Sequence, residues 1–459
     1  MKIFKDKMKK IYFCGISGSG MSSLAQILKY QGNDVYGSDR NFDLGRDLQN
    51  KSKLEEIGIK IFPQDGSYVS KDIDFLCVST AVEDSIPDVK KAKSLGIKIK
   101  TRPQLLAEVF HQYKYGVAIA GTSGKTTTTA MVGYILDKAE MCPCMVNGGL
   151  LKDYSENKGI PNIIYNKGDV CVVEADESNG SIDLYNPFAS VITNISEDHK
   201  SLDELEELFS RFANRTSNGV VFNDDYDLCR KIIKKGISFS LKNPKADFYA
   251  SDIVALPEGT QYVFRGKTFT LKLIGDFNVG NALAAIATVN LLGVDVFQAA
   301  EILQDFSGTK RRLEVIGTKN GITLIDDFAH NPDKVKASVS ALRKYTGRLI
   351  VIFQPHGFGP MRSLGKEIMQ NYAKFLSDDD IFVMPEIFFV GGTVTKDISS
   401  EDFINYIKAQ GKENAYFFAD WKELEDFVVN QASEGDRIIV MGARDNSLTD
   451  FCYRILERV

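Results

Sequence analysis

Residues 116–131, GVAIAGTSGKTTTTAM, place a glycine turn and a lysine between an apolar run and a threonine-rich stretch. A strand that ends in Gly-x-x-Gly-Lys-Thr and opens a helix presents backbone N–H groups to an anion at the positive end of the helix dipole. Lys125 would reach the β- and γ-phosphates of a nucleotide, and the Thr126 hydroxyl would take a position on Mg²⁺. The strict P-loop pattern needs a glycine five residues before Gly124, where Ile119 stands. The turn is therefore a shortened variant that predicts phosphate binding on a parallel α/β sheet.

The order of strand, turn and helix begins three times along the 459 residues. The first start is KIYFCGISGSG at residues 10–20, the second is the phosphate turn, and the third is ITLIDDFAHNP at residues 322–332. Short β-branched runs alternate with amphipathic stretches throughout, a pattern typical of parallel α/β sheets. We therefore expect three α/β domains, over residues 1–108, 109–307 and 308–459.

Two predicted strand ends beside the phosphate turn carry possible metal ligands. The run DVCVV leads into Glu174, and SVITNI leads into the sequence EDH that ends at His199. Such side chains gather at the carboxyl edge of an open parallel sheet, where a carboxylate or a neutral imidazole can hold a divalent cation against phosphates. We expect Thr126, Glu174 and His199 to bind the metal. The neighbouring acids Asp176, Glu177 and Asp198 are equally compatible with solvated loops.

The composition argues against several classes of protein. The net charge is −5, from 56 basic and 61 acidic residues, and without a long basic block a nucleic-acid-binding face is not expected. No apolar run approaches the roughly 18 residues of a membrane span, and the basic start leads directly into a predicted strand, so we expect no secretory signal. The seven cysteines are scattered, and Cys142-Pro-Cys144 lacks the spacing of a redox or zinc motif. Reduced, mostly buried thiols and a cytoplasmic location are expected.

A series of motifs across nearly the whole chain resembles the Mur ligase family. In order, they are AGTSGKTTTTAM, VVEADES, VITNISEDH, GDFNVGNALAA, KRRLEVIG and IDDFAHNPDKV. The resemblance implies a Rossmann-like domain for a nucleotide sugar, a central P-loop-type ATP-binding domain and a C-terminal Rossmann-like domain that closes over the site. It also implies an ATP-dependent amide ligase of peptidoglycan synthesis, with ATP and two Mg²⁺ ions. The γ-phosphoryl group would pass to a carboxylate, and an amine would attack the resulting acyl phosphate.

The resemblance assigns roles to individual residues of this chain. The expected catalytic residues are Lys125, Glu174, His199, His356 and Arg362. The expected ATP-binding residues are Gly121, Thr122, Ser123, Gly124, Lys125, Thr126, Thr127, Asn278, Asn281, Arg312, Asp327, His330 and Asn331. Asn278 is also compatible with a helix N-cap, and Asn331-Pro332 with a cap and helix start.

The glycine turn at residues 15–20 has two interpretations. G-I-S-G-S-G follows a strand, and Asp39 comes 19 residues after Gly20, as in a dinucleotide fingerprint with an acid on the ribose. That fingerprint needs a glycine at Ser17, whereas G-x-x-G-x-G-M-S resembles the UDP-binding turn of the alanine-adding Mur ligases. Backbone amides would hold a diphosphate in either case. The expected sugar-nucleotide residues are Gly15, Ser17, Gly18, Ser19, Gly20, Met21, Ser22 and Asp39. Close helix–strand packing alone is a simpler explanation for the glycines.

Four positions depart from the alanine-adding branch. Ser123 stands where that branch usually carries histidine, and Phe277 stands where the family's motif carries histidine. Gly357 and Pro360 replace two arginines of the branch that are expected near the substrate carboxylates. A phenyl ring can pack on adenine but cannot hydrogen-bond it, and an arginine fork is hard to replace. The departures leave the added amine open between L-alanine, a preformed peptide and another amine.

The sequence thus predicts amide formation on UDP-N-acetylmuramic acid or a close analogue. The partners are small molecules, with no nucleic acid and no membrane, and monomer and homodimer are both compatible with the sequence. An NAD(P)-dependent oxidoreductase is a rival that Ser17 disfavours, and a catalytically silent nucleotide-binding regulator is another.

Overall fold

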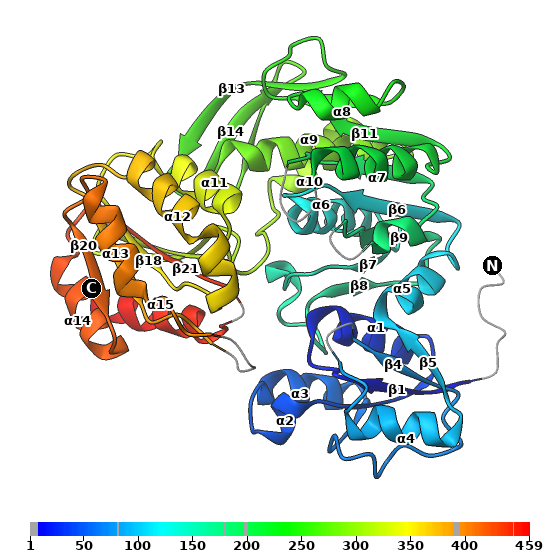
Figure 1. Ribbon diagram of the computed structural model, residues 1–459. Helices are drawn as coiled ribbons and strands as arrows, with labels where there is room; N and C mark the ends of the chain where they lie inside the picture. Colours follow the sequence, from blue (N-terminus) through cyan, green and yellow to red (C-terminus); the bar gives the residue numbers. More distant parts are fainter. Residues whose placement is uncertain (1–7, 80–81, 178–179, 197–200, 390–394, 444) are drawn as a thin grey trace. The chain divides into compact units, whose positions relative to one another are not determined.

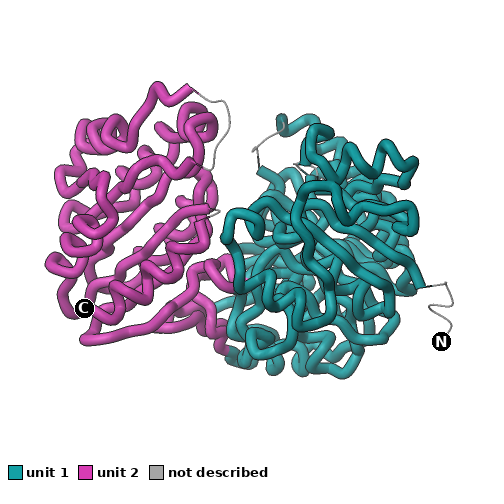
Figure 2. The backbone as a smooth tube through the Cα atoms, turned by 90° about the horizontal axis from the view of Figure 1, so that it is seen from below, with its two compact units in different colours: residues 1–251, 263–269, 280–309 teal, residues 252–262, 270–279, 310–459 magenta. Residues whose placement is uncertain are grey.

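A computed structural model describes residues 8–79, 82–177, 180–196, 201–389, 395–443 and 445–459. Within these residues the chain forms three β-sheets with helices packed against them (Figure 1). It divides into two compact units (Figure 2). The first unit contains residues 1–251, 263–269 and 280–309, and the second contains residues 252–262, 270–279 and 310–459.

The first sheet is parallel and has the strand order β3-β2-β1-β4-β5. Its strands are β1 (Lys10–Cys14), β2 (Asp34–Ser38), β3 (Lys60–Phe62), β4 (Phe75–Val78) and β5 (Lys98–Thr101). Its helices are α1 (Ser19–Tyr30), α2 (Arg40–Asp43), α3 (Leu48–Glu56), α4 (Pro87–Leu95) and α5 (Arg102–Phe110). These are the first five strands of the Rossmann order 3-2-1-4-5-6, in which the strand order reverses between β1 and β4. The turn after β1 therefore lies at the place where such sheets bind ligands.

The second sheet has ten strands in the order β15-β14-β13-β12-β11-β10-β6-β9-β7-β8. Its first strands are β6 (Tyr115–Ala120), β7 (Cys144–Val146), β8 (Ile163–Tyr165), β9 (Val170–Glu174) and β10 (Ala189–Ile192). The others are β11 (Gly219–Asn223), β12 (Ile237–Ser240), β13 (Phe248–Leu256), β14 (Gly259–Phe264) and β15 (Lys267–Leu271). The helices are α6 (Lys125–Lys138), α7 (Leu202–Asn214), α8 (Asp227–Ile232), α9 (Asp276–Asn290) and α10 (Val296–Leu303), with short 3₁₀ turns at Lys152–Tyr154 and Ser181–Leu184. β6 lies between β9 and β10, so the phosphate turn that follows it has a strand end on each side.

One continuous core joins the first sheet to the second within the first unit. It includes Phe13 of β1, Leu24 of α1, Leu106 of α5 and Val173 of β9, all at most 4% exposed. Helices α1 and α5 thus bury apolar side chains in a core that both sheets share.

The third sheet has the order β16-β17-β21-β18-β19-β20. Its strands are β16 (Glu314–Lys319), β17 (Ile322–Asp327), β18 (Leu349–Phe353), β19 (Ile381–Pro385), β20 (Ala415–Phe418) and β21 (Arg437–Met441). Helices α11 (Pro332–Leu342), α12 (Phe358–Phe375) and α13 (Ser400–Ala409) share one apolar core with the sheet. Helices α14 (Trp421–Gln431) and α15 (Ser447–Arg458) share another. Helices thus cover both faces, which explains why strands such as β18 are entirely buried.

The predicted α/β class is confirmed, and the largely parallel second and third sheets also contain antiparallel strand pairs. β8 pairs antiparallel with β7, and β16 pairs antiparallel with β17. Three further strands, β13, β14 and β15, lie over residues 248–271, a segment without a predicted element. The domain boundaries at residues 108 and 307 stay predictions.

The other expectations about composition concern cysteines and membrane spans. All seven cysteines are free; six are buried and Cys142 is exposed. Among the residues that the structure describes, no helix has both the length and the apolar character needed to cross a bilayer.

Candidate functional site

The phosphate turn is a tight backbone loop between β6 and α6. Gly121 has a φ of 129°, and a side chain there would come within 2.1 Å of Thr193 Oγ1. Gly124 has a φ of 88°, and a side chain there would come within 2.7 Å of Asn281 Oδ1. Both positions therefore require glycine, because L-residues rarely adopt such φ values and no room exists for a Cβ. The first N–H groups of α6 have no partner within the helix, which leaves them to an anion.

The end of β10 braces this turn through contacts that the sequence analysis missed. Asn194 Oδ1 accepts from the Ser123 N–H at 2.9 Å, and Asn194 Nδ2 donates to the Ser123 carbonyl at 2.9 Å. The Thr193 hydroxyl donates to the same carbonyl at 2.6 Å. The Thr122 hydroxyl donates to the Ser196 carbonyl at 3.1 Å. The signal was present in the motif VITNISEDH, but nothing local in the sequence says which backbone these polar residues will meet.

Lys125, the first residue of α6, is held inside the site by two partners. Its ammonium group donates to Glu177 Oε2 at 2.8 Å and Oε1 at 3.1 Å, and to the Gly121 carbonyl at 2.5 Å. The side chain of Lys125 is 16% exposed and that of Glu177 is 10% exposed. Glu177 was expected to be a solvated loop acid as readily as a ligand, and in the structure it pairs with the phosphate-binding lysine.

Two of the three expected metal ligands meet beside the turn. The Thr126 hydroxyl donates to Glu174 Oε2 at 3.1 Å, and the Gly148 N–H donates to Glu174 Oε1 at 2.6 Å. The hydroxyl and carboxylate oxygens are donors that Mg²⁺ prefers, so this pair fits the ion that the sequence predicts. The third expected ligand, His199, lies outside the described residues.

Helix α9 brings one of the two asparagines expected to bind ATP to the phosphate turn. Asn281 Oδ1 accepts from the Thr128 hydroxyl at 3.3 Å, and Asn281 is 8% exposed. Asn278 is buried and donates from Nδ2 to the Ile274 carbonyl at 2.8 Å. Because α9 begins at Asp276, Asn278 lies inside the helix, and the interpretation as an N-cap is wrong. Phe277 is 39% exposed, and Thr127 is buried in α6.

The glycine turn after β1 is organised by the end of β2. Gly15 has a φ of 86°, and the Gly15 and Ile16 N–H groups donate to the Ser38 carbonyl at 2.9 and 3.1 Å. Asp39 Oδ2 accepts from the Ser17 N–H at 2.8 Å, and Oδ1 accepts from the Asn41 N–H at 2.9 Å. Asp39 therefore holds the turn and caps α2.

An arginine that the sequence analysis did not single out lies over this turn. A side chain at Gly20 would come within 2.9 Å of Arg102 Cδ and 3.1 Å of its Nη1, which places this guanidinium beside the first turn of α1. A cation next to a helix N-terminus strengthens an anion site. The remaining expected sugar-nucleotide residues lie in the same place, because Gly18 precedes α1 and its first turn contains Ser19, Gly20, Met21 and Ser22.

In the second unit, Arg311 and two acids form a buried network at the end of β17. Arg311 Nε donates to Asp326 Oδ1 at 3.2 Å, and its Nη2 donates to the Gly442 carbonyl at 2.8 Å. Asp327 accepts from the Ser338 hydroxyl and, at 3.2 Å, from the Leu313 N–H. Burial raises the pKa of both carboxyl groups above the usual range, opposed by Arg311 and Ser338. The expected nucleotide ligand Asp327 thus already holds two groups of its own unit.

The other expected nucleotide residues of this unit lie just after β17. His330 Nδ1 lies 2.8 Å from the Phe328 carbonyl, and burial lowers the pKa of His330 to about 4, helped by the positive charge of Lys334. The neutral ring therefore carries its proton on Nδ1 and turns Nε2 into an acceptor. The Arg312 guanidinium lies 5.1 Å from the centre of the Phe328 ring. Asn331 caps α11, where its Oδ1 accepts from the Lys334 N–H at 3.0 Å.

His356 and Arg362 flank the start of α12. His356 lies after β18, with its ring 5.6 Å from that of Phe388. Arg362 donates to Asp397 Oδ1 at 2.5 Å on the surface. The two departures between them have a local reason: Gly357 has a φ of 77° at the N-cap, and Pro360 lies in the first turn of α12. A first-turn N–H has no helical partner, so proline costs little there.

The structure therefore brings the expected residues together in three groups. Residues 121–126 meet Glu174 and Asn281, the turn at residues 15–20 meets Asp39, and residues 326–331 lie at the carboxyl edge of the third sheet. The first two groups belong to the first unit and the third to the second.

Three family models match consecutive parts of the chain. The Mur ligase family catalytic domain matches residues 10–114, and the Mur ligase middle domain matches residues 119–289. The domain described as Mur ligase, glutamate ligase domain, matches residues 311–444.

Curated relatives match over almost the full length. A UDP-N-acetylmuramate–L-alanine ligase of Sulfurihydrogenibium sp. (strain YO3AOP1) is 36% identical over 460 residues, which cover 96% of each chain. A protein of the same name from Caldanaerobacter subterraneus subsp. tengcongensis is 33% identical over 462 residues, again 96% of each chain.

Solved structures also align with the chain over almost its full length. The UDP-N-acetylmuramate–alanine ligase MurC of Thermotoga maritima aligns with a TM-score of 0.80 at 28% identity and covers 98% of both chains. A murein peptide ligase of Psychrobacter arcticus 273-4 aligns with a TM-score of 0.67 over 98% of both chains, and at 23% identity it supports the fold alone. With three domains matched in order and relatives above 30% identity along nearly all of its length, this chain belongs to the Mur ligase family.

Proposed function

We propose that the chain is an ATP-dependent ligase that joins L-alanine to UDP-N-acetylmuramic acid in peptidoglycan synthesis. The observation that carries the proposal is the convergence of Lys125, Thr126 and Glu174 where β6, β9 and α6 meet. The curated relatives above 30% identity carry that activity in their names, which supports L-alanine as the amine. ATP and a UDP-linked sugar are metabolites of the cytoplasm, which supports a cytoplasmic location.

The phosphate turn supplies what phosphoryl transfer to a carboxylate needs. The substrate carboxylate and the γ-phosphate are both anionic, so positioning and cationic stabilisation are the main requirements. Lys125 provides the charge, and the N-terminal amides of α6 bind the phosphate chain. Thr126, Glu174 and His199 would hold Mg²⁺, which neutralises phosphate charge when it is bound.

The glycine turn after β1 is the proposed binding place of the UDP diphosphate. The backbone N–H groups at the start of α1 and the Arg102 guanidinium would bind its oxygens, while Asp39 keeps the turn in shape. Arg312, Asp327, His330 and Asn331 of the second unit are proposed to bind ATP, as the resemblance to the family implies.

The test is ADP release by the purified protein with UDP-N-acetylmuramic acid, Mg²⁺-ATP and a panel of amines. We expect ADP only when both the sugar nucleotide and L-alanine are present, and none from Lys125→Ala. A preference for a preformed peptide would change the amine but keep the reaction class. If no sugar nucleotide stimulates ADP formation, the proposed function is wrong.

A further inference from the structure

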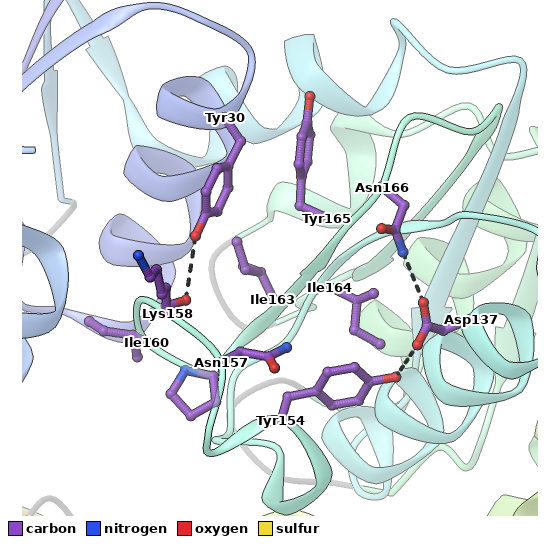
Figure 3. Close-up of a pocket in the computed structure, with 11 residues that line it drawn as sticks. Tyr30, Asp137, Tyr154, Asn157, Lys158, Ile160, Ile163, Ile164, Tyr165 and Asn166 are labelled. Carbon is purple, nitrogen blue, oxygen red and sulfur yellow. Dashed lines mark hydrogen bonds between the residues drawn. The ribbon is translucent and has the colours of Figure 1, made fainter. Parts of the chain in front are cut away.

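The helix that begins at the glycine turn, α1, meets the second sheet at residues 159–165, and part of this junction is open. A cavity of about 300 Å³ lies there, with Tyr30 of α1 and Tyr165 of β8 on its wall (Figure 3). The two rings are stacked with centres 5.5 Å apart. The Tyr30 hydroxyl donates to the Lys158 carbonyl at 3.4 Å. This weak, partly exposed contact cannot set the orientation of α1, so the buried contacts nearby decide it.

One turn of α1 deeper, the side chain of Gln26 is fully buried and completely hydrogen-bonded. Its Oε1 accepts from the Ile160 N–H at 2.8 Å. Its Nε2 donates to the Ile160 carbonyl at 3.2 Å and to Asn162 Oδ1 at 2.9 Å. Gly159 permits this approach, because a side chain there would come within 2.3 Å of Gln26 Oε1. A buried amide that satisfies three groups fixes the orientation of Asn162, since any rotation would leave polar atoms unpaired.

Asn162 is fully buried as well and reaches both candidate sites. Its Nδ2 donates to the Ser19 carbonyl at 2.9 Å and to the Ser22 hydroxyl at 3.1 Å, both in the first turn of α1. The main-chain carbonyl of Asn162 accepts from the Asn147 N–H at 2.9 Å. The next residue, Gly148, donates its N–H to Glu174 Oε1 at 2.6 Å. A short series of hydrogen bonds thus runs from the helix start at the glycine turn to the carboxylate beside the phosphate turn.

We propose that Asn162, oriented by Gln26, is a positioning residue that sets the start of α1 and the loop at residues 147–148 in one fixed arrangement. The proposal rests on the proposed function, in which these two places carry the sugar nucleotide and the metal carboxylate. The carboxylate of a bound sugar nucleotide must come within reacting distance of a phosphate held at the other place, and small misplacements of reacting groups are costly. Asn162 contacts both the start of α1 and the loop at residues 147–148, and in this proposal it fixes the position of each relative to the other.

The test compares Asn162→Asp with Tyr30→Phe. The aspartate has nearly the size of asparagine but presents an acceptor to the Ser19 carbonyl, so it breaks the link to α1. Tyr30→Phe removes a hydrogen bond at the same junction without touching Asn162 and is the matched control. If Asn162→Asp does not fold, Asn162→Ser takes its place, because its hydroxyl is too short to reach Ser19.

Hydrogen exchange of the ligand-free protein is the first readout. We expect the amides of residues 21–23 and 147–148 to exchange about tenfold faster in the Asn162 variant, and to be unchanged in Tyr30→Phe. If neither segment responds, or only one of them does, Asn162 does not link the two places and the proposal is overturned.

Steady-state kinetics are the second readout. We expect kcat/KM for UDP-N-acetylmuramic acid to fall about 10- to 100-fold in the Asn162 variant, while the KM for ATP stays within about twofold. A variant that only unfolds at lower temperature, with wild-type constants per folded molecule, would show a purely structural role and overturn the proposal. If the wild type itself makes no ADP with any sugar nucleotide, the proposed function fails, and the exchange measurement still decides the role of Asn162.

Discussion

The ammonium group of Lys125 lies 2.8 Å from Glu177 Oε2, so the lysine expected to bind phosphate is paired with a carboxylate. The pair is mostly buried, and the Gly121 carbonyl completes the shell around the ammonium at 2.5 Å. A nucleotide that enters this turn must share Lys125 with Glu177 or displace it. The pair orients the lysine toward the turn, and we expect its carboxylate to compete with the phosphates for the ammonium group.

Glu177→Gln should tighten the binding of Mg²⁺-ATP. The substitution keeps a polar side chain near Lys125 but removes the negative charge that competes with the phosphates. We expect a gain of about 1 kcal/mol, or about fivefold in Kd, because the pair retains some solvent contact. Titration with a fluorescent non-hydrolysable ATP analogue measures it. Weaker binding in this variant would show that Glu177 itself supports the nucleotide.

Glu174→Gln should lower kcat and raise the Mg²⁺ concentration needed for half-maximal rate. The amide can still accept from the Gly148 N–H, so the loop stays in place, but the charge that attracts the ion is lost. We expect kcat to fall about 100-fold, as for other groups that stabilise developing charge. Thr126→Ser, which keeps the hydroxyl that contacts Glu174, is the control and should stay near wild type. Equal Mg²⁺ dependence in Glu174→Gln and the wild type would remove Glu174 from the metal site.

Asp39→Asn should raise the KM for the sugar nucleotide and leave the KM for ATP unchanged. Asp39 accepts from the Ser17 and Asn41 N–H groups through separate oxygens, and an amide can offer an oxygen to only one of them. Loss of a turn contact or an N-cap costs about 1–2 kcal/mol, which corresponds to about 5- to 30-fold. Initial rates with each substrate varied in turn give the two KM values. A rise in the KM for ATP alone would contradict a sugar-nucleotide role for this turn.

His330 should make the protein less stable as the pH falls from about 6.5 toward 4. Its pKa is about 4 in the folded chain, below the unfolded value, so the unfolded state binds more protons in that interval. The stabilisation from the neutral ring is fully present above pH 6.5 and disappears through the folded pKa. The difference in unfolding free energy between wild type and His330→Gln should change by about 2 kcal/mol across this range. Urea unfolding at several pH values measures it, and a constant difference would show that the ring is not buried as described.

Gly357→Arg, which introduces an arginine at a position where the alanine-adding branch carries one, should destabilise the second unit. Gly357 has a φ of 77°, where side chains other than glycine are strained by about 1 kcal/mol or more. Gly359→Ala is a matched control two residues along, because a side chain there would meet open space and an alanine suits the helix. Thermal unfolding should therefore give a lower Tm for Gly357→Arg and an equal or higher Tm for Gly359→Ala. A lower Tm in both would attribute the effect to the helix start in general.

The parts of the site that were predictable are those encoded by neighbouring residues. A strand, two required glycines, a lysine and a threonine follow one another in the chain, so the phosphate turn and α6 appear as predicted. Glu174 was found because the carboxyl ends of parallel strands share an edge, a rule that needs no coordinates. The capping role of Asn331 was also predictable, because the N–H group that it accepts from belongs to Lys334, three residues along the chain.

The parts that could not be predicted depend on contacts between distant segments. Asn194 braces a turn 71 residues earlier, and Asn162 contacts a helix 143 residues earlier. The residues around Asn194 and Asn162 show no pattern that predicts these contacts, because the contacts depend on how the two sheets of the first unit pack. The strands over residues 248–271 were missed for a related reason: they extend the edge of a sheet and alternate polar with apolar residues only irregularly. The role of His199 stays a prediction.

The distribution of thiols makes this protein ready for site-specific labelling. Since six cysteines are buried and Cys142 is exposed, a maleimide dye should modify the unaltered chain at one position. Cys142 follows the far end of α6, a helix of 14 residues, and so lies about 20 Å from the phosphate turn. A fluorophore there would leave the turn open to nucleotide, and paired with a fluorescent nucleotide it would report occupancy and release in real time without any mutation.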